Sequence, residues 1–152
     1  MSPQVEQRIR DVARRRTPRG WSVIERKPRN DTIGMVKLRS RVIYVPPLVD
    51  EDALFVLLHE IAHIENRHLV DNARDYDAPP CWQMEFEAET WAIAAMRAEG
   101  FIVRHDMVAA ARLNVRHRLQ EAAATAQLER DLEKVDPAAI KFAFPRDWRD
   151  WA

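Results

Sequence analysis

The chain has 152 residues, of which 47% are hydrophobic, and its 24 Lys and Arg residues balance its 24 Asp and Glu residues. This length and hydrophobic content predict a single globular domain, and the balanced charge argues against a nucleic-acid coat protein or a cationic membrane peptide. Cys81 is the single cysteine, which excludes an intrachain disulfide and a cysteine-based zinc site. The charged N-terminus lacks the apolar core of a signal peptide, and no apolar run approaches the ~20 residues that span a bilayer. We therefore expect a soluble, cytoplasmic protein without a membrane partner.

The first third of the chain predicts a basic helix followed by a small sheet. Apolar residues at helical spacing among arginines indicate an amphipathic helix over residues 3–16. Three runs rich in β-branched residues follow, at Trp21–Lys27, Thr32–Leu38 and Arg41–Val45. They predict a three-stranded antiparallel sheet over residues 21–45, and we expect the last run to be an exposed edge strand beside the next helix.

The rest of the chain predicts three helices, which makes the expected fold α+β, with helices packed on one side of the sheet. Acidic residues after two prolines predict a capped helix over 50–68, which contains the sequence HEIAH. A polar loop leads to a second helix over 79–99, which carries several glutamates and ends at a glycine. A long third helix is predicted over 106–134, and the aromatic residues of the tail are expected to pack on the body.

The sequence His59-Glu60-Ile61-Ala62-His63 is the strongest functional signal. Residues four apart on a helix differ by only about 40° around its axis, so His59 and His63 can bind one ion from successive turns. Glu60 lies close to the same face, where a carboxylate can act as general base toward water activated by zinc. Catalytic zinc usually takes three protein ligands, so a third ligand must lie elsewhere. His68 is about 140° from His63 around a continuing helix and is predicted to point away.

The helix over 79–99 offers acidic candidates for the third ligand. Glu85 and Glu89 lie on a small, apolar face, where buried acids need a partner such as a zinc ion. We assign Glu85 as third ligand and Glu89 as the hydrogen-bond partner of a ligand histidine, with Glu89 or Glu87 as alternative ligands. Glu87 is about 200° from Glu85 around the helix, so we expect its loss to affect zinc binding little.

The sequence HEIAH followed by E-x-x-A-E-x-W-A over Glu85–Ala92 resembles the gluzincin metallopeptidases, and within them the ImmA/IrrE-like peptidases of bacteria, phages and mobile elements. The resemblance covers roughly residues 32–96 and implies a minimal zincin-like domain with a two-helix zinc cleft. It also implies a sheet edge that binds an extended peptide, and cleavage of a regulator such as a repressor. Matched residue by residue, the implied ligands are His59, His63 and Glu85, and the implied base is Glu60. Ala62 and Glu89 depart from the glycine and the Asn or Asp that are common in the family.

Two functions are compatible with these patterns, and the oligomeric state stays open. The first is a zinc-dependent endopeptidase that hydrolyses a protein partner bound as an extended segment. The second is a non-catalytic module that binds a regulator or DNA, with a structural or vestigial zinc site and the basic N-terminal helix as its working surface. Basic runs of this kind are more typical of solvated helix faces than of nucleic-acid contacts. A peptidase also needs a group that stabilises the oxyanion, for which the candidates are Tyr76, His68, His105 and His117.

Overall fold

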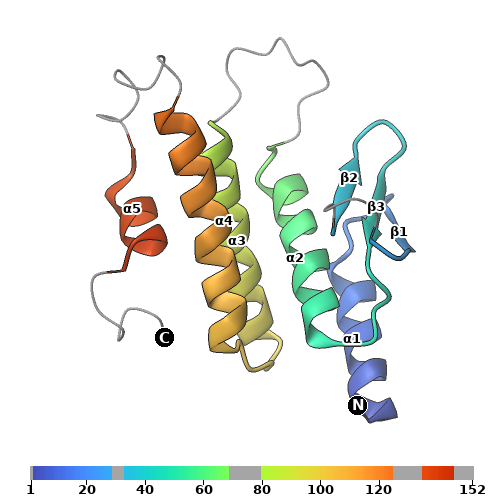
Figure 1. The fold of residues 1–152 in the computed structure, drawn as a ribbon. Helices are drawn as coiled ribbons and strands as arrows, with labels where there is room; N and C mark the ends of the chain where they lie inside the picture. The colour runs from blue at the N-terminus through green and yellow to red at the C-terminus, as the bar shows by residue number, and fades with distance from the viewer. Residues whose placement is uncertain (1, 29–32, 69–79, 125–134, 146–152) are drawn as a thin grey trace.

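The computed structural model describes residues 2–28, 33–68, 80–124 and 135–145, and within them the fold is α+β. The elements are α1 (Pro3–Arg16), β1 (Ser22–Glu25), β2 (Met35–Lys37), β3 (Val42–Val45), α2 (Glu51–Glu65), α3 (Cys81–Ala98), α4 (His105–Ala123) and α5 (Pro137–Ala143). Figure 1 shows them in sequence across the molecule, with the sheet and α1 on one side, α2 in the middle, and α3, α4 and α5 beyond it. No helix of the described ranges is both long and apolar enough to cross a membrane.

The sheet is mixed, which corrects the prediction of a fully antiparallel sheet. Its strand order is β1-β3-β2, with β3 parallel to β1 and antiparallel to β2. The chain therefore leaves β1, runs back along β2 and returns as β3 between them. Ile43 and Val45 explain this arrangement, because both are fully buried and a central strand can pair its backbone on both sides while it buries them. The prediction that Arg41–Val45 is the exposed edge strand is therefore wrong, and β2 is one of the two edges.

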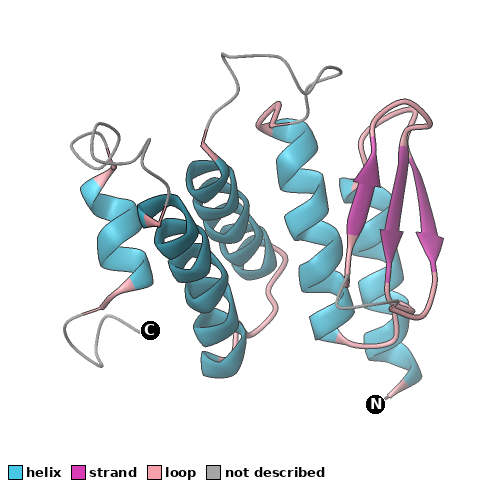
Figure 2. Ribbon diagram, turned by 45° about the horizontal axis from the view of Figure 1, so that its top comes forward, coloured by secondary structure: helices cyan, strands magenta, loops and turns pink. Residues whose placement is uncertain are grey.

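The sheet lies across α1, and α2 lies next to both of them (Figure 2). The main core forms where α1, α2 and β3 meet and extends to the inner face of α3. Its largest fully buried side chains are Ile9, Val12, Ile43, Val45, Leu54, Leu57, Leu58, Ile61 and Met96. This core fixes α2 through its apolar face, while His59 and Glu60 on another face of that helix line a cleft.

The beginning and end of α2 follow from local chemistry. The Asp50 carboxylate accepts a hydrogen bond of 2.8 Å from the backbone N–H of Ala53, which caps the first turn. The helix ends at Glu65 rather than at the predicted residue 68. Arg67 has a φ of 57°, and this left-handed residue turns the chain out of the helix. The α1 bounds agree with the predicted range 3–16.

The C-terminal elements differ from the prediction mainly in one added helix. The helix α3 begins at Cys81 after Pro80, and α4 runs from His105 to Ala123, while residues 125–134 of the predicted long helix lie outside the described residues. The short helix α5 was not predicted, although Asp136 caps it through the backbone N–H of Ala138 at 2.8 Å. A second apolar cluster joins α5 to α3 and α4, and Phe142 of the tail packs on it. Phe144 is exposed instead, and Trp148 and Trp151 lie outside the described residues.

Candidate metal centre

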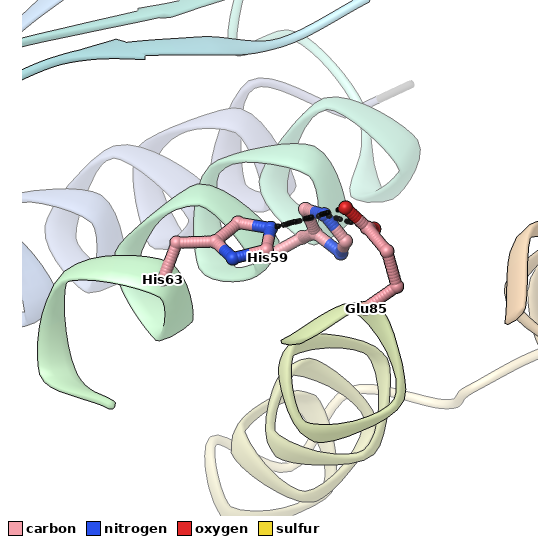
Figure 3. Close-up of side chains that lie close together, drawn as sticks. All are labelled: His59, His63 and Glu85. Carbon is pink, nitrogen blue, oxygen red and sulfur yellow. Dashed lines mark hydrogen bonds and ion pairs between the residues drawn. The ribbon is translucent and has the colours of Figure 1, made fainter. Parts of the chain in front are cut away.

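Three side chains from α2 and α3 converge on one point (Figure 3). The Nε2 atoms of His59 and His63 are 3.0 Å apart, and the Glu85 carboxylate lies 3.3 Å from the first and 3.8 Å from the second. One ligand atom from each residue fits within 4.8 Å of the other two. Tetrahedral zinc with bonds of about 2.1 Å holds its ligand atoms about 3.4 Å apart. The three residues therefore form a group whose ligand atoms are spaced closely enough to hold one metal ion.

The charges of this cluster favour a cation. Burial opposes the charged form of His59, but hydrogen bonds to Glu85 and Glu89 outweigh it and raise the pKa of His59 to about 10. Burial likewise opposes ionisation of Glu85, yet the contacts with His59, His63 and Asn114 lower its pKa to about 2. His63 is different, since burial and the neighbouring positive charge lower its pKa to about 4. The carboxylates thus stabilise a positive charge on His59, and a divalent ion held by the same groups would replace that charge.

Glu60 lies beside the converging ligands without joining them. Burial raises the pKa of its carboxyl to about 7, an effect that His59 opposes and Glu85 reinforces. A carboxyl with a pKa near neutrality can both accept and return a proton. The backbone at Gly34 approaches it closely, because a Cβ added there would lie 2.5 Å from Glu60 Oε1 and 2.7 Å from Val56 Cγ1. A side chain at position 34 would therefore displace Glu60.

Glu89 occupies the position beside His59 that the sequence assigned to it. Its Oε1 atom lies 3.4 Å from Nδ1 of His59, the ring nitrogen that faces away from His63. Asn114 of α4 joins the two acids, donating to Glu85 at 2.7 Å and to Glu89 at 2.8 Å. The buried Oε2 of Glu89 has no hydrogen-bond partner among the described residues. Sequence reasoning missed Asn114, whose signal is a polar residue next to the apolar stripe of Ala111 and Val115 on α4.

An open cleft of about 480 Å³ gives access to this centre. Its lining includes Ile33 and Gly34 before β2, His59 and Glu60 from α2, and Asn114 and Arg118 from α4. The edge strand nearest to the cleft is therefore β2, not β3. The sequence places Arg118 in a basic cluster with Arg112, Arg116 and His117. Its Nε is buried without a hydrogen-bond partner among the described residues, while its Nη1 forms an ion pair of 2.9 Å with Glu121.

Of the four candidate oxyanion stabilisers, the three that the structure describes do not line the cleft. His68 is buried behind His63 and hydrogen bonds to it, so it does not line the cleft. His105 and His117 are exposed on α4 and are not among the residues that line the cleft. Tyr76 lies outside the described residues. Arg118 is the arginine among the described residues that line the cleft.

Comparisons of the chain with protein-family models, curated proteins and solved structures find no match.

Proposed function

We propose that this protein is a zinc-dependent endopeptidase of the gluzincin type, with a zincin-like fold. The observation that carries the proposal is the convergence of His59, His63 and Glu85 at an open cleft, with Glu60 beside them. Two histidines and a glutamate are the ligands of well-known zinc peptidases, which keep one position free for water or substrate. The donor set contains no thiolate, as expected for a catalytic rather than a structural zinc site.

Each side chain has a distinct part in peptide hydrolysis. When bound, zinc supplies Lewis acidity that polarises a peptide carbonyl and makes water more acidic. Glu60 accepts a proton from the attacking water and returns it to the nitrogen of the leaving amine, so that water is added across the C–N bond. Glu89 holds the ring of His59, and Asn114 holds both acids of α3 in place.

The substrate is a protein segment in extended conformation, bound along β2. This strand is at an edge of the described sheet, and the residues before it line the cleft. An unpaired edge can pair with the backbone of a peptide and present its carbonyl groups to the centre. The resemblance to ImmA/IrrE-like peptidases suggests a transcriptional regulator or repressor as the natural partner.

The alternative of a DNA- or regulator-binding module has less support. Arg15 and Arg16 of the basic helix both form ion pairs of 2.7 Å with Glu99. The helix α4 carries a second basic run, which consists of Arg112, Arg116, His117 and Arg118. Arg116 donates to the backbone carbonyl of Ala143 at 2.9 Å, and Arg112 is buried. Several arginines of both runs are thus used within the molecule rather than presented to a nucleic acid.

Zinc content and a Glu60→Gln variant test the proposal. Protein prepared without chelator should contain about one zinc per chain, and Glu60→Gln should retain it. The wild type should cleave members of a mixed peptide library that Glu60→Gln leaves intact. Protein without zinc would refute the proposal, and zinc-loaded wild type that cleaves no peptide or partner would favour the binding module.

A further inference from the structure

His63 has a second hydrogen bond that leads away from the cleft. Its Nδ1 lies 3.0 Å from Nδ1 of His68, and Nε2 of His68 lies 2.7 Å from Oε2 of Glu87. The His68 side chain is 1% exposed, whereas that of Glu87 is 38% exposed and receives a further hydrogen bond of 2.9 Å from Gln83. A chain of three side chains therefore runs from the centre to the surface on the opposite side of α3 from Glu85.

The turn at the end of α2 makes this chain possible. The backbone N–H of His68 donates to the carbonyl of His63 at 2.9 Å, and that of Arg67 donates to Ile64 at 3.1 Å. These two bonds, with Arg67 in the left-handed region, form a Schellman motif. A continuing helix would carry His68 about 140° away from His63. The turn reverses the chain and returns the imidazole of His68 to the ring of His63.

Glu87, the acceptor at the end of these hydrogen-bonded side chains, determines which atom donates in each hydrogen bond. An ionised glutamate can only accept, so Nε2 of His68 carries a hydrogen toward Glu87. In the neutral imidazole, Nδ1 of His68 then has a free lone pair and accepts from Nδ1–H of His63. This leaves the lone pair of His63 on Nε2, the atom that lies 3.0 Å from Nε2 of His59. The opposite direction would place a hydrogen on Nε2 of His63 and prevent it from binding a metal.

We infer that His68 and Glu87 are positioning residues that hold His63 in the tautomer and orientation that bind zinc through Nε2. The inference rests on the proposed zinc site. It assigns each ligand histidine its own support from α3, since Glu89 lies directly beside His59 while Glu87 reaches His63 through His68. Glu87 faces away from Glu85, as the helix phase predicts, but this inference differs from the expectation that its loss affects zinc binding little. The two acids serve two histidines from two sides of one helix.

Zinc affinity, measured by competition with a chromophoric chelator, tests the inference without an activity assay. His68→Phe keeps a buried ring but removes both hydrogen bonds, so its affinity should fall about 10- to 100-fold. His68→Gln should recover most of the loss, because its amide can accept from His63 and donate to Glu87. Glu87→Leu should weaken binding, and Glu87→Gln, which keeps an acceptor oxygen, should weaken it less. The matched control is His117→Phe on the exposed side of α4, which should leave the affinity unchanged.

The tautomer of His63 provides a second readout that a purely structural role would not move. Long-range proton–nitrogen NMR of the zinc-loaded wild type should show His63 bound through Nε2 and protonated at Nδ1, and Glu87→Leu should weaken or exchange that Nδ1–H signal. If His68→Phe does not fold, Glu87→Leu and His68→Gln decide the question, because both keep His68 or an isosteric amide in place.

The results separate this inference from the proposed function. If the wild type binds zinc and His68→Phe or Glu87→Leu binds it with the same affinity, the positioning role alone is overturned. Coordination of His63 through Nδ1 also overturns it. Wild-type protein that binds no zinc overturns both the positioning role and the peptidase.

Discussion

The two faces of α2 carry the same spacing of side chains but opposite chemistry. Four fully buried apolar residues occupy one face at positions i, i+3, i+4 and i+7, and they are Leu54, Leu57, Leu58 and Ile61. The same pattern shifted by two residues, or about 200° around the helix, gives the second face: Val56, His59, Glu60 and His63. The first face belongs to the core that α1, β3 and the inner side of α3 share, and the second meets Glu85 of α3 at the metal centre. One helix can thus hold partly buried histidines and a glutamate on one side, because apolar packing on its other side keeps the helix in place.

The largest expected effect is a loss of zinc affinity, which should follow from changes at the second face and not at the first. Glu85→Gln removes a charged ligand and should lower zinc affinity on the order of 1,000-fold, whereas Glu89→Gln should lower it about 10- to 100-fold because it only supports His59. The apo proteins should stay folded. Chelator competition measures the affinity and circular dichroism measures the fold, with exposed Glu65→Gln as control. Equal zinc affinity for wild type and Glu85→Gln would show that the second face is not a metal site.

The apolar face should respond in stability. Leu58→Ala leaves a cavity at a fully buried position and should lower the free energy of unfolding by about 2–5 kcal/mol, measured by urea denaturation with chelator present. Leu113→Ala is the matched control, because Leu113 is 50% exposed on α4 and should change stability by less than about 0.5 kcal/mol. The comparison would fail if the two variants were equally destabilised.

Gly34 tests the contact between the second face and the sheet edge. Gly34→Ala places a methyl group against Glu60 and Val56, so we expect a loss of stability of about 1–3 kcal/mol from overpacking. Zinc content should be retained, because the three atoms nearest to the added Cβ belong to Glu60 and Val56 and not to a ligand histidine. Cleavage should fall, because Glu60 is displaced. Unchanged stability and unchanged cleavage together would mean that the backbone before β2 moves aside freely.

The smallest effect concerns the ion pairs that join α1 to the end of α3. A hydrogen bond from Arg16, and to a smaller extent one from Arg15, lowers the pKa of the Glu99 carboxyl below its usual 4.5. Glu99→Gln should therefore lower the free energy of unfolding by about 1 kcal/mol at pH 7. Because the folded pKa is the lower one, this contribution is present above about pH 4.5 and is lost as the pH falls through the folded value. The difference between wild type and variant in urea denaturation should shrink between pH 7 and pH 3, and a difference that grew on acidification would contradict the assignment.

The elements that could be predicted from the sequence are those set by local spacing. The His59–His63 pair and the phase of Glu85 and Glu89 follow from the helical period, and the structure brings these residues together. The position of β3 could not be predicted in this way, because strand order depends on contacts between distant segments. His68 was placed wrongly for a different reason. Left-handed helix ends usually carry glycine, and Arg67 gives no such signal.

Asn114 has a consequence for the C-terminal half of the molecule. Its single amide nitrogen is shared by Glu85 and Glu89, so α4 touches the centre although it contributes no ligand. Since α4 packs on α3 and α5 packs on α4, a bound ion would be connected to α5 through Asn114 as well as through this apolar packing. By linkage, ion occupancy would slow amide hydrogen exchange in α4 and not only in the two helices that supply the ligands.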